Sequence, residues 1–94
     1  MKDHIITVTG TEMLWLFGEV DGLAFVTKVY DEGSVYGIDK GRVSKLALYS
    51  DNTELVVYER GWDKYPGDTD LEDTMEALLR FLAKVVVDTA RRET

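Results

Sequence analysis

Alternating and β-branched apolar residues dominate the first sixty positions of the chain and predict β-strands. Ile5 to Val8 is one such run, and Gly10-Thr11-Glu12 is expected to turn it into a second strand over Met13 to Val20. Asp21-Gly22 separates that strand from Leu23 to Val29. This pair is the two-residue signal of a type I′ hairpin, because both central residues of that turn need a positive φ. The pattern therefore predicts three consecutive antiparallel strands.

A further pair of strands and one helix complete the expected fold. Arg42 to Tyr49 and Glu54 to Tyr58 flank Ser50-Asp51-Asn52-Thr53, a cluster of turn-forming residues. The period then changes, because apolar residues recur along one helical face at Leu71, Met75, Leu78, Leu79, Leu82, Val85 and Val86. We predict an α+β fold, in which an antiparallel β-meander of four or five strands has one C-terminal helix packed across one face.

Signals for both ends of that helix are present. Thr69, followed three residues later by Glu72, fits a capping box, and Pro66-Gly67 stops the preceding strand from continuing. Arg91-Arg92 would suit the negative end of the helix dipole. These signals place the helix start at Thr69.

The run at 13–17 is apolar on both of its predicted strand faces. Trp15 and Phe17 share one face, and Leu14 belongs to the other. One helix covers only one side of a sheet, so the second side needs the loop at 30–41, a second copy of the chain or a partner protein to cover it. We predict self-association through Leu14, Trp15 and Phe17. The structural alternative is a central strand covered by the chain's own loop and N-terminus.

Length and composition bound the possible classes of protein. The 94 residues, 45% of them apolar, predict a single domain over 1–94 with one modest core. The chain has no cysteine, which excludes disulfides and thiolate chemistry. No secretory signal and no apolar run of membrane-spanning length is visible, so a cytoplasmic location without membrane contact is expected.

The charge of −7 disfavours direct binding to nucleic acid, and its distribution is uneven. Six acids lie between positions 63 and 76 against the single base Lys64: Asp63, Asp68, Asp70, Glu72, Asp73 and Glu76. Carboxylates in a first helical turn stabilise the helix through its dipole, which is the structural interpretation of this cluster. The functional interpretation is an acidic contact surface.

Aromatic residues and an arginine directly precede the acidic cluster. Trp, Tyr and Arg dominate the energetic centres of protein interfaces. The structural alternative is that Trp62 anchors the strand-to-helix connection in the core. We predict a partner-binding surface formed by Tyr58, Arg60, Trp62, Asp63, Tyr65, Asp68, Asp70, Asp73 and Glu76.

Catalytic and metal-binding motifs do not assemble in this sequence. His4 is the only histidine and lies near a terminus, so a catalytic triad or histidine metal site would depend on one weakly fixed residue. The segment 68–72 starts like a calcium loop, but Asp73 stands where that loop needs glycine and Leu79 where it needs glutamate. We expect no metal site.

The long connection at 30–41 also lacks a recognisable chemistry. Gly33, Gly37 and Gly41 are spaced by four and match neither a dinucleotide fingerprint nor a phosphate loop, so turn or bulge positions are expected. Asp31-Glu32 and Asp39 could pair for acid–base work, but no apolar neighbour adjoins them to raise a pKa. We therefore predict no catalytic residue, no cofactor and no enzymatic activity.

Several residue groups in the second half of the sheet and its loop form a recognisable succession. They are Asp31-Glu32-Gly33-Ser34, Tyr36-Gly37-Ile38, Gly41-Arg42-Val43-Ser44-Lys45-Leu46 and Tyr58-x-Arg60-Gly61-Trp62-Asp63. In these groups, over roughly residues 20 to 85, the chain resembles a family of short uncharacterised proteins encoded by bacteriophages and prophages. The resemblance implies no activity, because that family has none established. Gly61-Trp62-Asp63 and the acids after Tyr65 carry a second and much weaker resemblance, to some anti-CRISPR proteins that use carboxylates to mimic DNA phosphates.

These observations favour stoichiometric protein binding over catalysis. The specific hypothesis is a counter-defence inhibitor that offers its acidic helix start and neighbouring aromatics to a basic, nucleic-acid-binding groove on a host or phage protein. The alternative is a homo-oligomeric phage accessory or structural protein that uses the face bearing Trp15. A small enzyme built on the loop acids is the least favoured class.

Overall fold

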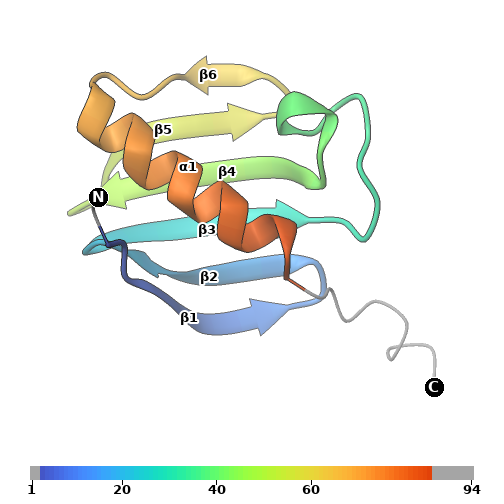
Figure 1. The fold of residues 1–94 in the computed structure, drawn as a ribbon, viewed down its shortest axis with the longest axis horizontal. Helices are drawn as coiled ribbons and strands as arrows, with labels where there is room; N and C mark the ends of the chain where they lie inside the picture. The colour runs from blue at the N-terminus through green and yellow to red at the C-terminus, as the bar shows by residue number, and fades with distance from the viewer. Residues whose placement is uncertain (1–2, 86–94) are drawn as a thin grey trace.

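A computed structural model describes residues 3–85 and shows six antiparallel strands with one helix across them (Figure 1). The strands lie in the sheet in chain order, as a meander. The α+β class with a C-terminal helix is confirmed, and the sheet has six strands instead of four or five. Their bounds are β1 Ile6–Glu12, β2 Trp15–Val20, β3 Leu23–Val29, β4 Val43–Ser50, β5 Thr53–Glu59 and β6 Trp62–Lys64; a short 3-10 helix, η1, spans Ile38–Lys40, and α1 spans Thr69–Ala83.

Two of the hairpin turns follow from their residues. Asp21 and Gly22 have φ angles of 52° and 83°, so the predicted type I′ turn between β2 and β3 is confirmed. Asp51 and Asn52, at 50° and 70°, form the same kind of two-residue turn between β4 and β5. Asp and Asn tolerate the left-handed region because their short polar side chains bond locally.

The predicted position of the first turn is wrong. β1 continues through Gly10 to Glu12, and the chain turns at Met13 and Leu14, where Met13 has a φ of 58°. A register shift between Val8 and Gly10 marks a bulge, which allows β1 to stay paired with β2 up to the Glu12–Trp15 pair. Gly10 is therefore a position inside a strand and lies opposite Phe17.

The sixth strand, β6, has only three residues and was not expected from the sequence. It pairs Trp62 with Tyr58 and Lys64 with Val57 at the edge of the sheet. Its residues Trp, Asp and Lys are all exposed, so they leave no alternation of buried and exposed positions from which a strand could be predicted.

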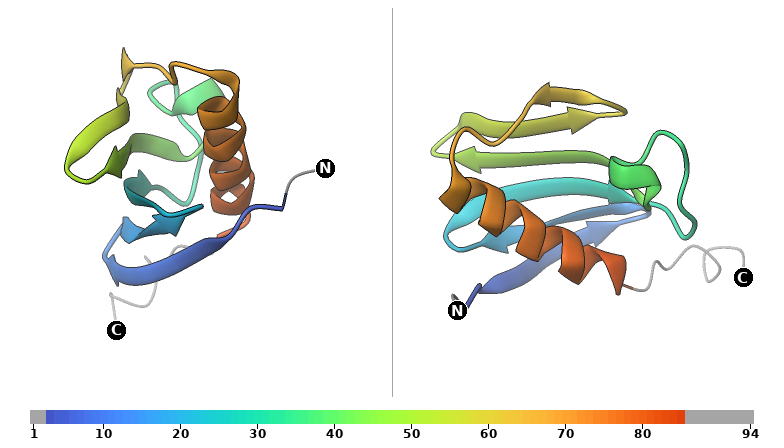
Figure 2. Two further views of the ribbon diagram at one scale, coloured as in Figure 1. Left: turned by 90° about the vertical axis from the view of Figure 1, so that its left-hand side faces the viewer. Right: turned by 45° about the horizontal axis from the view of Figure 1, so that its top comes forward.

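The core lies between α1 and one face of the sheet (Figure 2). Val85 is partly buried against this core beyond the helix end, whereas Val86 and Arg91-Arg92, which were expected to continue or terminate the helix, lie outside the described residues. The buried side chains are Leu16, Val20, Phe25, Val29, Val43, Leu46, Leu48, Val56 and Tyr58 from the strands, Ile38 from η1, and Met75, Leu78 and Leu82 from α1.

The helix start differs by one residue from the predicted capping box. Asp68 is the N-cap, and its carboxylate accepts a hydrogen bond from the Leu71 amide at 2.8 Å. Thr69 is thus the first helical residue. The Glu72 carboxylate does not return to the cap, because it accepts a hydrogen bond from the Tyr65 hydroxyl at 3.0 Å.

An arginine distant in sequence caps the other end of α1. The Arg42 guanidinium donates hydrogen bonds to the carbonyl oxygens of Leu82 and Val85, each at 2.7 Å. The Leu82 carbonyl belongs to the last helical turn, at the negative end of the helix dipole, and the Val85 carbonyl lies just beyond the helix end. Arg42 thereby ties the start of β4 to the end of the helix.

Replacing Arg42 with alanine should lower the free energy of unfolding by about 2 kcal/mol, because two charge-assisted hydrogen bonds to part-buried carbonyls are lost. Arg80→Ala, which removes an exposed arginine from the same helix, should cost about 0.5 kcal/mol or less. Urea unfolding followed by circular dichroism measures both. Equal losses in the two variants would show that the Arg42 contact contributes nothing specific.

Asp21 joins three parts of the fold through one carboxylate. Its Oδ1 accepts a hydrogen bond from the Ile5 amide at 2.8 Å, and its Oδ2 accepts one from the Thr74 hydroxyl at 3.2 Å. Oδ2 also lies 2.6 Å from His4 Nδ1. These contacts lower the pKa of Asp21, the His4 hydrogen bond contributing most and the Ile5 amide next. His4, the only histidine, therefore has a structural partner.

The Asp21 contacts predict an acid-dependent loss of stability. A carboxylate with a lowered folded-state pKa contributes stability above its ordinary pKa, and this is lost as the pH falls through the lowered value. Asp21→Asn should cost roughly 1 kcal/mol near neutral pH, with allowance for solvent screening, and the difference from wild type should shrink between about pH 5 and pH 2. The control is Asp51→Asn at the matching turn position. A wild-type advantage that is constant with pH would contradict the prediction.

Candidate protein-binding surfaces

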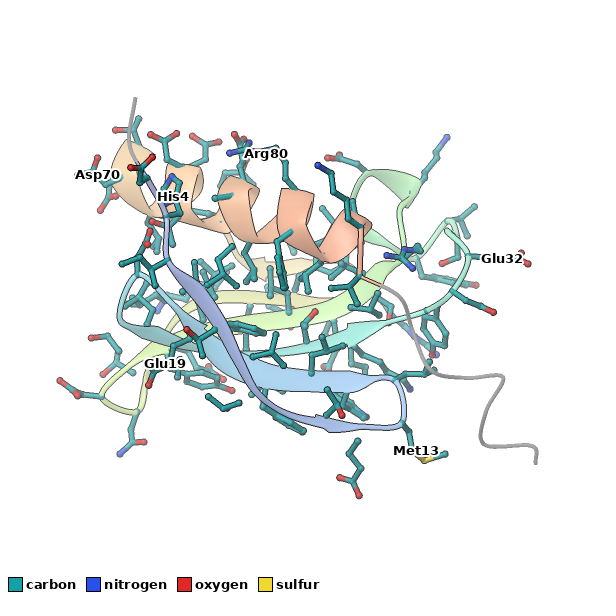
Figure 3. The ribbon with its side chains drawn as sticks, turned by 60° about the horizontal axis from the view of Figure 1, so that its bottom comes forward. His4, Met13, Glu19, Glu32, Asp70 and Arg80 are labelled. Carbon is teal, nitrogen blue, oxygen red and sulfur yellow. The ribbon has the colours of Figure 1, made fainter. Side chains whose placement is uncertain are left out.

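The sheet has one side that α1 does not cover, and no element among residues 3–85 crosses it (Figures 1 and 2). We call this side the open face. Its cross-strand rows are Trp15, Lys28, Lys45 and Glu59 at one end; Phe17, Val26, Ala47, Val57 and Lys64 across the middle; and Glu19, Ala24, Tyr49 and Glu54 at the other end. In Figure 3, Glu19 lies on this side of the sheet, away from α1.

The open face is apolar in the middle and charged at both ends. The apolar side chains of the middle row are half-buried by their neighbours, and a depression of about 550 Å³ lies over β4 to β6. Trp15 lines this depression, with the ammonium groups of Lys28 and Lys45 at 5.7 and 5.9 Å from its ring centroid. Lys45 also lies 3.5 Å from the Glu59 carboxylate. Cation–π contacts and this ion pair therefore hold the charged row in place.

The structure places two of the three predicted self-association residues on the open face. Trp15 and Phe17 share it as expected, in rows that also contain Lys28 and Val26. Leu14 lies in the β1–β2 turn instead, where its carbonyl accepts a hydrogen bond from the Val29 amide at 3.0 Å. The self-association itself stays a prediction.

The alternative in which the 30–41 loop covers this face is wrong for the described structure. The loop ends in η1, whose Ile38 is buried in the core beneath α1. Gly37 and Gly41 hold its compact shape, because a Cβ on Gly37 would overlap the Gly41 carbonyl oxygen. These glycines are therefore turn positions, as predicted. The loop lies at the end of the sheet, on the helix side.

Three aromatic rings form a row at the β6 edge of the sheet. Tyr58, Trp62 and Tyr65 stack edge to face, with centroid distances of 4.9 Å for the first pair and 4.7 Å for the second. Tyr58 is buried and donates a hydrogen bond to the Tyr36 carbonyl at 2.8 Å, so it is a core residue. Trp62 and Tyr65 retain exposures of 39% and 53%. Trp62 thus packs on the core without being enclosed by it.

The predicted partner-binding residues fall into separate groups. We call Trp62, Tyr65, Asp68, Asp70, Asp73 and Glu76 the acidic edge, because they lie together on β6, the connection after it and the first turns of α1. All six are exposed, and Figure 3 shows Asp70 on the helix side of the sheet. The Glu72 carboxylate raises the pKa of Tyr65 by accepting its hydroxyl hydrogen bond.

Asp63 and Arg60 do not belong to this edge. Asp63 lines the depression on the open face, on the other side of the sheet. Arg60 lies in the β5–β6 turn with a φ of 61°, and its guanidinium is 5.4 Å from the Tyr36 ring centroid. The nine predicted partner-binding residues therefore do not form one surface.

Sequence reasoning missed the lysines of the open face. A signal was available, because Trp15, Lys28 and Lys45 become neighbours once the hairpins are drawn in register. Residues 3–85 contain no group of three or more histidine or acidic side chains placed to hold a metal ion. No helix in the same range is long and apolar enough to cross a membrane.

Comparison with known proteins adds a family and no activity. No curated protein and no solved structure matches the chain. One family matches residues 14–83, from the residue before β2 to the last residue of α1, and both surfaces fall almost entirely within this span. The chain belongs to the family described as "Domain of unknown function (DUF7678)".

Proposed function

We propose that the protein acts by stoichiometric binding to another protein chain, and that the open face is its contact surface. The observation that carries this proposal is the uncovered middle row, in which Phe17, Val26, Ala47 and Val57 lie side by side across four strands. Contiguous apolar surface of this kind, bordered by charged groups, marks interaction sites on soluble proteins. No enzymatic activity is proposed.

Trp15 supplies the expected energetic centre of the contact. Tryptophan is enriched among the residues that dominate binding energy, and a partner that removes water around it would strengthen the contacts from Lys28 and Lys45. Lys64 is held at the edge by its hydrogen bond to the Glu54 carbonyl at 2.9 Å. The ordered positions of these long side chains reduce the entropy lost on binding.

A second copy of the chain is one partner that the charges support. Lys28 and Lys45 lie in the row at one end of the open face, and Glu19 and Glu54 lie in the row at the other end. When a second copy packs face to face with its strands running in the opposite direction, the lysines of each copy lie opposite the glutamates of the other, and the two apolar middle rows meet. A two-fold interface requires self-complementarity of this kind. This corresponds to a homo-oligomeric phage accessory or structural protein.

Sedimentation equilibrium of a Trp62→Phe variant, in which Trp15 is the only tryptophan, tests the identity of the partner. A dimer at micromolar concentration, with Trp15 emission that shifts to shorter wavelength as the dimer forms, identifies a second copy. A concentration-independent monomer directs the search to a host or phage protein captured from the host cytoplasm. A monomer that also captures nothing contradicts the proposed protein-binding function.

The acidic edge supports a second candidate, a counter-defence inhibitor that occupies a basic, nucleic-acid-binding groove on a host protein in the cytoplasm. The supporting observation is that exposed Trp62 and Tyr65 shortly precede the exposed acids Asp68, Asp73 and Glu76 in the chain, and that Tyr65 donates a hydrogen bond to Glu72 in the first turns of α1. Carboxylates spaced along a helix can pair with arginines and lysines that normally bind phosphates. The resemblance to phage proteins and anti-CRISPR proteins favours the same setting.

Neutralising the acidic edge distinguishes mimicry from simple helix capping. The variant carries Asp68→Asn, Asp70→Asn, Asp73→Asn and Glu76→Gln. If the acids only stabilise the helix dipole, each favourably placed charge accounts for roughly 0.3 to 1 kcal/mol of stability, and partner binding is unchanged. If they imitate phosphates, binding weakens far more than stability and the wild-type affinity falls steeply with salt. Affinity that is flat in salt eliminates mimicry.

A further inference from the structure

A second cavity lies at the end of the sheet and shares no residue with the depression on the open face. It has a volume of about 330 Å³, which is at the small end of the range for ligand pockets. It opens between the start of the 30–41 loop and the β5–β6 turn. Its lining consists of Tyr30, Asp31, Glu32, Ser34, Tyr36, Ser44 and Arg60.

Ser44 gives this cavity a buried hydroxyl without a partner. The residue is 5% exposed and its Oγ makes no hydrogen bond of regular geometry within residues 3–85, although it lies close enough to the Tyr30 phenol to lower the pKa of that group. Ser44 is the bulged residue of β4, because Lys45 pairs with Lys28 and Val43 with Val29. A bulge changes the direction of a side chain relative to the regular strand, and bulges are common beside functional sites. A buried unpaired hydroxyl is costly and calls for an explanation.

Arg60 is fixed beside Ser44 through the backbone. Its amide donates a hydrogen bond to the Ser44 carbonyl at 3.0 Å, and its φ of 61° places it in the left-handed region. This conformation is the one that the tight β5–β6 turn requires, and it fixes the direction of the Arg60 side chain. The guanidinium lies over the Tyr36 ring at 5.4 Å, which orients a strong cation and five potential donors along the cavity wall.

A second cation lies beside Tyr30, one of the residues that line the cavity. The Lys28 ammonium is 5.3 Å from the Tyr30 ring centroid. The pKa of the Tyr30 phenol is lowered, chiefly by Lys28, with smaller contributions from the nearby Ser44 and Arg60 side chains. The acids of this cavity lie at its exposed rim, and the Glu32 side chain extends away from the body of the protein (Figure 3).

We propose that this cavity binds a small ligand through an oxyanion, a carboxylate or a phosphate, which accepts hydrogen bonds from Ser44 Oγ and the Arg60 guanidinium. Charge-assisted donors of this type recognise both groups, and the Tyr30 and Tyr36 rings provide flat walls for the remainder of the ligand. The cavity shares no lining residue with the depression on the open face, although Lys28 lies beside both, and the two hypotheses can fail separately.

Titration of the ¹⁵N-labelled protein with sodium phosphate and, separately, sodium acetate tests the site. Sodium chloride at matched ionic strength is the reference. Saturable shifts of the Ser44 and Arg60 amides, with a dissociation constant in the millimolar range, are expected for at least one probe. The probe that binds more tightly distinguishes phosphate from carboxylate. If neither probe gives saturable shifts at concentrations up to about 50 mM, well above the expected dissociation constant, the proposal is overturned.

Two substitutions and a matched control make the assignment specific. Arg60→Gln keeps the side-chain length and should weaken binding by about tenfold or more, whereas Arg80→Gln on the exposed face of α1 should leave it unchanged. Ser44→Ala should also weaken binding. Equal weakening by Arg60→Gln and Arg80→Gln would show an effect of net charge alone and would overturn the site.

The stability of Ser44→Ala provides a readout that does not depend on the ligand. Removing a buried hydroxyl that has no partner should raise the melting temperature of the unliganded protein by about 4 °C. A variant that is more stable and binds the probe less tightly has lost a group retained for binding. A lower melting temperature would mean that Oγ makes an important contact within the fold, and this would contradict the proposal.

Discussion

Gly18→Ala should lower the free energy of unfolding by about 3 kcal/mol or more, because the added methyl group has no room between β1 and the core. Gly18 lies in the middle of β2, on the side of the sheet that faces α1. A Cβ at this position would overlap the Thr7 carbonyl oxygen of β1 and lie 2.9 Å from the Phe25 ring. Thr7 is fixed by strand pairing and Phe25 is fully buried, so neither neighbour can move at low cost.

Thermal unfolding measures this effect directly. A loss of 3 kcal/mol corresponds to a decrease in melting temperature of roughly 12 °C or more for a domain of this size. Gly67→Ala is the matched control, because no atom lies within 4 Å of its added Cβ and its φ is outside the left-handed region. That variant should be neutral or stabilised by a few tenths of a kcal/mol. Similar melting temperatures for the two variants would show that β1 and Phe25 are not packed as described.

Val26→Lys should weaken the binding of the partner chain by roughly 30-fold or more, equivalent to about 2 kcal/mol, while leaving the domain folded. Val26 occupies the centre of the middle row on the open face and pairs with Phe17 and Ala47. In the free protein it is half-buried, so a lysine there can extend its ammonium into water. In a complex the same ammonium would be enclosed by apolar surface, at a high desolvation cost.

The control for this experiment is Val35→Lys. Val35 is 76% exposed in the loop, away from the open face, so the same chemical change is made where no contact is proposed. Binding is measured as the dissociation constant of self-association or as the amount of captured partner protein. Unchanged binding by Val26→Lys would exclude the open face as the contact surface, and equal weakening by both variants would indicate an effect of net charge.

Local sequence signals predicted much of the fold. Asp21-Gly22 specified its turn because few residue pairs accept two positive φ angles, and the helical period located α1 to within a few residues at its start. Gly10 misled the prediction of the first turn, because a glycine inside a strand and a glycine in a turn look alike in one sequence. β6 forms because it pairs with β5, and its own three residues show no strand pattern. Only the tertiary structure therefore reveals this strand.

The features of the candidate sites that the sequence did not predict depend on contacts between residues far apart in the chain. The uncovered face was predicted from the apolar run at 13–17, since one helix cannot cover both sides of a sheet. Arg42 and Asp21 are held by hydrogen bonds to residues far away in the sequence. The Leu82 carbonyl is 40 positions from Arg42, and the Thr74 hydroxyl is 53 positions from Asp21, so local sequence patterns do not encode these contacts. Arg60 and Asp63 were grouped with Trp62 because they are near in sequence, but the turn and the strand direct them to different places.

Site-specific photo-crosslinking in living cells that produce the protein tests most directly whether the open face is the contact surface. A photoreactive phenylalanine derivative replaces Tyr49, on the open face, or Tyr65, on the acidic edge, so that one aromatic residue is exchanged for another in each case. The proposed contact predicts a protein adduct of defined mass from position 49 and little or none from position 65, with a mass of twice the chain if the partner is a second copy. Adducts from position 65 alone, or none from position 49, would contradict it.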